Sequence, residues 1–273
     1  MDYKRIEWIF LVVFVAIDIF LGIGISMTPA QLNTPQSTET VSINQEMAAD
    51  NITLPKKVAT APEDGYYLAV KTSNGAQDDL RSRLTDLKNV SMNYEASTRQ
   101  LTVTLNQPIL LSSHSKQALK QVEAFKNKKI NVPYGTAYTY VPILSNDQSY
   151  VFIQKSSFGA IFDERARLTI NVKDHRIVGY VERHLGQIGA VRERQATVSA
   201  SHAVKALYTY SELPNNSRVR WIKLCYSELT EVRGNTIFLP TWVVAVENKS
   251  TKTLQIKRVN AFSGTVMSAE PSD

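Results

Sequence analysis

A run of apolar residues near the start of the chain, residues 6–25, limits what this sequence can form more than any other feature. A helix of this length extends about 30 Å, which is the thickness of the hydrocarbon core of a bilayer. Lys4 and Arg5 precede the run, and the next basic residue after it is Lys56. Because basic residues favour the cytoplasmic side, we predict a cytoplasmic tail at residues 1–5, a transmembrane helix over the run and an extracellular remainder.

A cleavable signal peptide is the alternative interpretation of this segment. Such a peptide has an apolar core of about 7–15 residues that ends at a small-x-small cleavage site. The apolar run here is longer, and the sequence of residues 26–30, Ser-Met-Thr-Pro-Ala, is a poor cleavage site. We therefore predict an uncleaved anchor and a single-pass protein of the cell membrane.

Asp18 interrupts the apolar run in its second half, and a second acid, Glu7, lies at the start of the run. An ionised carboxylate inside a membrane helix costs at least about 2.5 kcal/mol unless it has a partner. At about 100° per residue, Glu7, Gly22 and Ser26 lie near the same face, and Gly22 and Ser26 form a small-xxx-small pair. The alternative is that Glu7 and Ser26 are merely interfacial and Gly22 is incidental. We expect Glu7, Asp18, Gly22 and Ser26 to form a stripe that contacts a partner helix.

The rest of the chain is large enough to bury a core, since 43% of the 273 residues are hydrophobic. The single cysteine, Cys225, excludes an intrachain disulfide, so the fold must rely on packing. Cys225 lies in an alternating run and is expected to pack within a strand. The net charge of +6 favours anionic surroundings such as lipid headgroups or wall polymers. Nucleic acid is excluded as a partner by the extracellular location.

Composition and periodicity divide the extracellular part into a linker and two lobes. Residues 26–61 are rich in Thr, Ser, Asn, Gln and Pro, which predicts a flexible linker. Residues 62–158 are expected to form a first lobe and residues 159–273 a second. Hairpins with segregated helices indicate the α+β class, in which helices pack on antiparallel sheets.

The apolar spacing predicts individual elements. Helices are expected at residues 77–89, 115–128 and 199–213. Strands are expected at residues 65–70, 90–95, 100–105, 138–144, 150–155, 167–173, 176–185, 218–229, 236–247 and 253–262. We expect Ser113 or Ser115 to cap the second helix. Asp174 and His175 should form a tight turn, and Pro240 should mark a bulge or a sheet edge.

The sequence offers little support for catalysis or metal binding. None of the four histidines, which are His114, His175, His184 and His202, lies four residues from another. The sequence contains no HExxH, GxSxG or GxxxxGK[ST] motif. We therefore predict no catalytic residues, no metal site and no cofactor.

One short motif, Ser-His-Ser-Lys at residues 113–116, fits the S-x-x-K pattern of penicillin-interacting enzymes. That chemistry also needs a downstream S-D-N and K-T-G. The nearest candidates, residues 145–147 and residues 71–73, are wrong in sequence, and the second also precedes the motif. A membrane-tethered cell-wall enzyme is kept as an alternative, and we expect a protein that is not an enzyme.

The N-terminal sequence, at residues 1–6, 9–10 and 17–21, resembles the YycI (WalI) family, whose members are encoded beside the WalK/WalR (YycG/YycF) two-component system. The resemblance extends to the layout of tail, anchor, linker and exported α+β region. Residues 240–246 and 259–266 also look like the end of a PepSY-type domain, in which a helix packs on a small antiparallel sheet.

This resemblance implies a regulator that is not an enzyme and that controls a sensor histidine kinase of the WalK/YycG type, which governs cell-wall metabolism. It implies action together with a YycH-type membrane protein, as a hetero-oligomer, through transmembrane and extracellular contacts. The family offers no catalytic residues to carry over. The remaining alternative is an extracellular module that senses a ligand bound between its lobes.

Overall fold

The computed structural model describes residues 8, 11–15, 17, 37–71, 80 and 82–267. The chain divides into two compact units, residues 1–46 and 47–273, which are described separately. In the first unit, the described residues of the apolar run are helical and their side chains are exposed. No helix in the described part of the chain is long and apolar enough to cross a membrane. Most of the expected transmembrane helix lies outside the described residues, so that helix stays a prediction.

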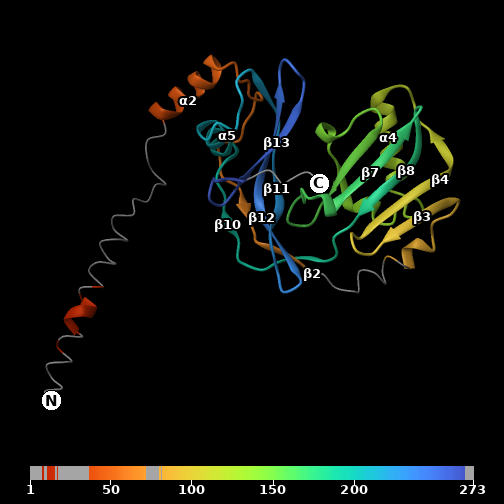
Figure 1. Cartoon of the computed structure of the whole chain (residues 1–273), viewed down its shortest axis with the longest axis horizontal. Helices are drawn as coiled ribbons and strands as arrows, with labels where there is room; N and C mark the ends of the chain where they lie inside the picture. The colour runs from red at the N-terminus through yellow and green to blue at the C-terminus, as the bar shows by residue number, and fades with distance from the viewer. Residues whose placement is uncertain are drawn as a thin grey trace. The chain divides into compact units, whose positions relative to one another are not determined.

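A six-stranded antiparallel sheet and one helix in the second unit form what we call the first lobe (Figure 1). The order of the strands is β3-β4-β8-β7-β6-β5. The strands span Val90–Glu95 (β3), Gln100–Leu110 (β4), Tyr138–Tyr140 (β5), Ser149–Gln154 (β6), Arg167–Lys173 (β7) and Arg176–Arg183 (β8). The helix α4 spans Ser115–Lys126, and short 3-10 turns lie at Gly135–Ala137, Pro142–Leu144 and Glu164–Ala166.

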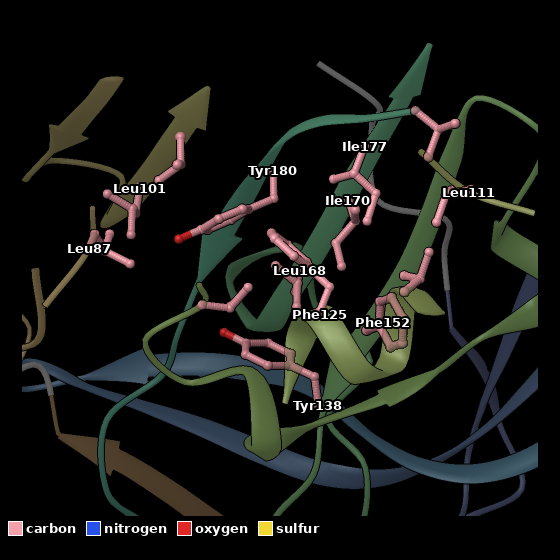
Figure 2. Packing of buried hydrophobic residues seen from close by; sticks show 14 of the residues in the cluster. Leu87, Leu101, Leu111, Phe125, Tyr138, Phe152, Leu168, Ile170, Ile177 and Tyr180 are labelled. Carbon is pink, nitrogen blue, oxygen red and sulfur yellow. The ribbon is translucent and has the colours of Figure 1, made fainter. Parts of the chain in front are cut away.

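The core of the first lobe lies between α4 and one face of the sheet. Val122 and Phe125 of α4 are buried against Phe152, Leu168 and Tyr180 of the strands (Figure 2). The apolar spacing that predicted this helix therefore gives its buried face. Its N-cap differs from the prediction, because it is His114 rather than a serine and its side chain makes no capping hydrogen bond.

Local turn chemistry explains the hairpin of β7 and β8. Asp174 and His175 both have positive φ angles, of 50° and 55°, as a two-residue type I′ turn requires. Lys173 and Arg176 pair directly across this turn. The tight turn expected from the sequence is confirmed.

The second lobe is a second six-stranded antiparallel sheet with the helix α5 (Figure 1). Its order is β14-β13-β12-β2-β9, and β11 also pairs with β12. The strands span Leu68–Lys71 (β2), Ile188–Ala190 (β9), Ser217–Val232 (β11), Asn235–Asn248 (β12), Leu254–Asn260 (β13) and Val266–Met267 (β14). A separate two-stranded sheet joins Asp64–Gly65 (β1) to Gln195–Ala196 (β10).

Helix α5 spans Ala200–Thr209, and its cap is visible in the sequence. The Ser199 hydroxyl accepts a hydrogen bond from the backbone N–H of His202, which satisfies one free donor of the first turn. The helix buries Ala203, Val204 and Leu207. The three expected strands that follow are present as β11, β12 and β13. The prediction that this lobe resembles a PepSY domain stays a prediction.

Backbone contacts join the two lobes. Residues 160–162 run beside β11, where the N–H of Phe162 donates to the carbonyl of Tyr226 and the N–H of Tyr226 donates to the carbonyl of Ala160, both at 2.8 Å. Ile161 of this segment is fully buried in a cluster that also contains Phe238. The lobes therefore share part of a core.

The sheet order differs from the predicted division at residues 158 and 159. The β7–β8 hairpin was assigned to the second lobe, but β8 pairs with β4 and completes the first sheet. Conversely β2, which was assigned to the first lobe, pairs with β12. A hairpin is formed by local pairing, whereas the choice of a neighbouring strand depends on edges far apart in sequence, which periodicity does not report.

The expected linker at residues 26–61 also differs from the structure over its described part. A helix, α2, spans Ser37–Ala49. Met47 and Ile52 are buried, and the backbone of Thr53 bridges to β11. Tyr208 of α5 donates a hydrogen bond to the Asp50 carboxylate. Two apolar residues in a polar stretch are enough to dock it when a neighbouring surface supplies the rest of the core.

Pro240 lies in β12, an interior strand, rather than at an edge. On one side, β2 pairs with β12 as far as Phe238, and β13 pairs with it from Thr241 onward. Pro240 sits between these two pairings, and its carbonyl accepts a hydrogen bond from Ala261. The missing N–H therefore falls where the neighbouring strand changes, which is how an interior strand tolerates proline.

Of the first expected helix, at residues 77–89, only part lies in the described residues. Leu80 and residues 82–84 are helical, and a turn follows at residues 85–86. Leu80 and Leu87 are buried in the core of the first lobe, as their spacing predicted.

Candidate functional site

The predicted membrane contact cannot be located in the structure. Glu7, Asp18, Gly22 and Ser26 all lie outside the described residues. The stripe that they form therefore stays a prediction from the sequence.

The S-x-x-K motif lies at the start of α4. Ser113 and Lys116 are both exposed, and their side chains form no hydrogen bond or ion pair with any described residue. Ser145, from the nearest S-D-N candidate, donates a hydrogen bond to the carbonyl of Val141 within its own loop. In the described part of the chain, these residues are surface and loop positions.

Two other expectations can be compared with the described residues. Cys225 is fully buried in a cluster with Val243, and burial raises the pKa of its thiol to about 12, which disfavours a reactive thiolate. This agrees with the expected packing role. No group of three or more His, Cys, Asp or Glu side chains among the described residues could hold a metal ion.

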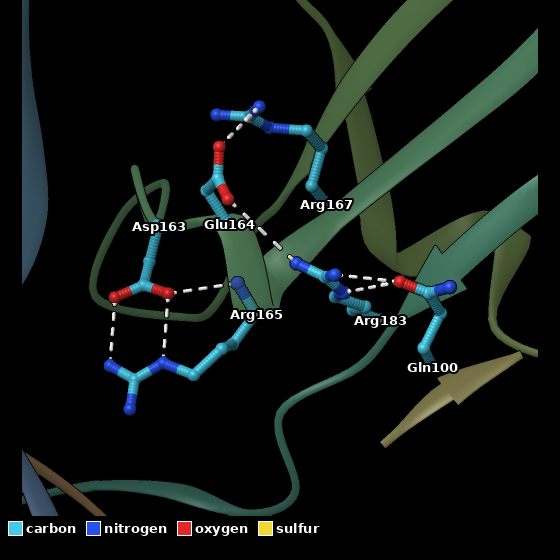
Figure 3. Close-up of polar contacts among 6 residues, drawn as sticks. All are labelled: Gln100, Asp163, Glu164, Arg165, Arg167 and Arg183. Carbon is cyan, nitrogen blue, oxygen red and sulfur yellow. Dashed lines mark hydrogen bonds and ion pairs between the residues drawn. The ribbon is translucent and has the colours of Figure 1, made fainter. Parts of the chain in front are cut away.

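The junction of the two lobes carries a network of charged side chains (Figure 3). Arg165 donates to both carboxylate oxygens of Asp163, at 3.0 and 2.9 Å, and also pairs with Glu228 of β11. Arg183 donates twice to the amide oxygen of Gln100, at 2.9 and 2.6 Å. Hydrogen bonds to Asp163 raise the pKa of Arg165 further above its ordinary value. These contacts fix the arginines rather than leaving them free to bind a ligand.

A cavity of about 360 Å³, which we call the interlobe cleft, lies beside this network. The first lobe lines it with residues 97–99 of the β3–β4 turn and with Arg183. The second lobe contributes Val70, Glu231 and Thr236. The volume lies in the range of small-molecule sites.

Arg99 differs from the other two arginines of the interlobe cleft. Its guanidinium has no ion-pair or hydrogen-bond partner among the described residues, and its backbone has a positive φ of 52°. The turn therefore presents one uncommitted positive charge to the cleft.

A buried carboxyl lines a separate small cavity that shares Arg99 and His184 with the interlobe cleft. Glu182 of β8 is 2% exposed and faces the core, two residues beyond Tyr180. Its Oε1 accepts a hydrogen bond of 3.2 Å from the backbone N–H of Tyr134, whereas its Oε2 has no partner among the described residues. Burial raises the pKa of Glu182 to about 8, against the opposing effects of the Tyr134 hydrogen bond and the Arg83 charge. The carboxyl is therefore largely protonated at neutral pH.

Aromatic rings surround this carboxyl. Tyr134 stacks on His184 with 3.9 Å between ring centroids, and the Arg83 guanidinium lies 4.6 Å from the Tyr134 ring. The hydroxyl of Tyr138 donates to the carbonyl of Arg183. Burial, reinforced by the Glu182 charge, raises the pKa of Tyr138 well above its ordinary value. These rings shield Glu182 from solvent.

Sequence reasoning did not single out Glu182 or Arg99. Glu182 lies in a correctly predicted strand, and alternation places it on the same face as Tyr180. A charged residue at an inward position was the signal that could have found it. Arg99 closes a turn between two strands, where an arginine carries no signal of its own.

A comparison with family models identifies the YycI protein family over residues 31–262. A comparison with curated protein sequences finds no match. The family model therefore covers most of the region that contains both lobes.

Three solved structures are similar at low sequence identity. An uncharacterised protein from Eubacterium rectale is 13% identical, with 81% of this chain and 92% of that chain covered and a TM-score of 0.44. The C-terminal domain of Bacillus megaterium YpeB is 13% identical, with 74% and 98% covered and a TM-score of 0.39. YycH from Bacillus subtilis is 14% identical, with 82% and 62% covered and a TM-score of 0.43.

The family match is the comparison that assigns the chain. It covers more than half of the sequence, including every strand of the two lobes except β14, and it agrees with the resemblance noted at the N-terminus. This protein belongs to the YycI family.

Proposed function

We propose that this protein is a membrane-anchored regulator, not itself an enzyme, that controls a sensor histidine kinase of the WalK/YycG type together with a YycH-type partner. The observation that carries the proposal is the family match over residues 31–262. In this proposal the N-terminus lies in the cytoplasm and both lobes lie outside the cell. The second lobe, in which α5 packs on an antiparallel sheet, is then a PepSY-like domain.

The proposed mechanism uses the membrane helix as well as the exported lobes. A carboxyl at Asp18 is stabilised inside the bilayer when it contacts a polar partner, and the small residues Gly22 and Ser26 let a neighbouring helix approach. Contacts between membrane helices are worth about 1 kcal/mol, which is enough to shift signalling states that differ by a few kcal/mol. The helix therefore biases the kinase while the lobes hold the YycH-type partner.

The test is co-purification of the full-length chain with the kinase from membranes, together with a reporter gene under kinase control. We expect Asp18→Leu and Gly22→Leu to reduce capture of the kinase several-fold and to change reporter output. Gly24→Leu is the matched control, because Gly24 lies about 120° around the helix from Asp18 and should behave as wild type.

Two outcomes would count against different parts of the proposal. Unchanged capture and output in both test variants would remove the helix contact but leave regulation by the lobes. The regulatory function itself would be overturned by two results together. The wild-type preparation would contain neither the kinase nor a YycH-type protein, and deletion of this protein would leave reporter output unchanged.

A further inference from the structure

Two cavities in the first lobe meet at the same side chains. A small cavity of about 30 Å³ contains Glu182, and Arg99 and His184 line both this cavity and the interlobe cleft. The small cavity has room for one atom group the size of a water molecule. Arg99 and His184 therefore lie between the interlobe cleft and the small cavity that Glu182 lines.

The polar groups that line the two cavities are mainly hydrogen-bond donors. Arg99 supplies a guanidinium that no described acid neutralises, and Thr98 supplies a hydroxyl beside it. A protonated Glu182 donates through a hydroxyl, and its Oε2 is the oxygen without a partner among the described residues. The acid that faces the cleft is Glu231, and Ser97 is already bound to Glu95 at 2.9 Å. A ligand that complements these donors must present acceptor oxygens.

We propose that the interlobe cleft binds a small organic oxyanion, a carboxylate or a phosphate group, through the Arg99 guanidinium. One oxygen of the anion enters the small cavity and accepts a hydrogen bond from the protonated carboxyl of Glu182. A carboxylic acid held neutral by an apolar site can donate in this way. The proposal is independent of the kinase contact, because it concerns a ligand of the lobes alone.

Binding of this kind is linked to protonation. Burial raises the pKa of Glu182 to about 8, and an anion beside the carboxyl raises this pKa further. The described titratable and charged groups that face Glu182 are Arg83, Tyr94, Arg99, Tyr134, Tyr138, Tyr180 and His184. Because ionised Glu182 repels an anion, affinity should fall as the pH rises through about 8.

The experiment is isothermal titration of the full-length chain in detergent micelles with acetate and, separately, with inorganic phosphate. The titrations run at several pH values from about 6 to about 9 and at constant ionic strength, so that they bracket the pKa of Glu182. We expect saturable binding of at least one anion at the acidic end and at least tenfold weaker binding at the alkaline end. The two anions distinguish a carboxylate ligand from a phosphate ligand.

Three variants test the named residues. Arg99→Ala should weaken binding at least tenfold, whereas Arg176→Ala, an exposed arginine at the far end of the same sheet, should not change it. Glu182→Gln keeps a hydrogen-bond donor but cannot ionise. This variant should therefore bind the anion at the acidic end and should still bind it at the alkaline end. His184→Asn should leave the pH at which binding is lost unchanged, because the proposal assigns that transition to Glu182.

Specific results would overturn the inference. One is that neither anion binds saturably at the acidic end. Another is that the Arg99→Ala and Arg176→Ala variants bind equally well. The third is that the Glu182→Gln variant keeps the pH dependence of wild type. Loss of binding in a variant counts only if its thermal unfolding matches wild type. The conservative variant Arg99→Lys should retain part of the affinity, because it keeps the positive charge but loses the planar fork of donors.

Discussion

The two lobes differ in the polar groups that they bury. Within the described residues, the first lobe buries three ionisable side chains, which are Lys126, Asp163 and Glu182. The strands β11 and β12 of the second lobe bury only neutral hydroxyls, including Ser217 and Ser227. A neutral hydroxyl costs far less to bury than a charge. Sensitivity of this protein to pH should therefore reside in the first lobe.

Asp163 is paired with Arg165, and the other two groups, Lys126 and Glu182, differ in how fully their hydrogen bonds are satisfied. The Lys126 ammonium donates to the carbonyls of Gly135 and Tyr138, at 2.6 and 3.2 Å, and to the side chain of Asn127 at 2.8 Å. All three of its donors are used. Glu182, by contrast, has one oxygen paired and one without a partner among the described residues. A satisfied charge can serve structure, whereas an unsatisfied one calls for a ligand, a water molecule or a proton.

The largest expected effect tests whether the lobes are separate at all. Phe152 in the first lobe and Phe238 in the second are both fully buried. Phe152→Ala and Phe238→Ala should each lower the free energy of unfolding by about 3–5 kcal/mol, because each leaves a cavity. Since Ile161 joins the lobes through a shared cluster, both variants should move one transition, measured by circular dichroism in urea. Two separable transitions, each moved by one variant, would show independent lobes.

The next effect tests the satisfied charge. Lys126→Met keeps the apolar stem but removes the ammonium donor from the carbonyl of Tyr138 and leaves the carbonyl of Gly135 with only the backbone N–H of Tyr138, so the free energy of unfolding should fall by about 2 kcal/mol. Lys120→Met, at an exposed position of the same helix, should change it by less than about 0.5 kcal/mol. Equal urea midpoints for the two variants would mean that the ammonium contributes nothing to the fold.

The last effect tests the unpaired carboxyl of Glu182, and here the variant should be more stable than wild type rather than less stable. The folded-state pKa of Glu182, about 8, lies above its ordinary value of 4.5, so folding takes up a proton between these values. The associated stability is fully present below about pH 4.5 and is lost as the pH rises toward 8. Glu182→Gln should therefore be more stable than wild type at about pH 8 and nearly equal to it at about pH 5. Urea unfolding at both pH values measures this, and a variant less stable than wild type at the higher pH would refute it.

Much of the local structure could be predicted from the sequence. The strands at residues 90–95 and 167–173 and the Asp174–His175 turn follow from periodicity and from the conformations that turn residues adopt. The buried face of α4 was predicted from its apolar spacing in the same way. These features depend on interactions that a short segment makes with itself.

Less of the candidate site could be predicted. The stripe of Glu7, Asp18, Gly22 and Ser26 rests on the sequence and lies outside the described residues. The interlobe cleft depends on the pairing of β2 with β12 and of β8 with β4, and neither pairing joins segments that are neighbours in sequence. Arg99 and Glu182 come together only once those sheets are formed.

By itself, the sequence determined the α+β class, most of the helices and strands and a resemblance to one family, because periodicity, turn residues and caps act locally. Only the tertiary structure decided which strands share a sheet, how part of the expected linker docks and where an unpaired carboxyl is buried. Those outcomes depend on complementarity between surfaces far apart along the chain. The same reason explains why Pro240 fits within an interior strand. It lacks a backbone N–H at the point where the pairing of β12 with β2 ends and its pairing with β13 begins.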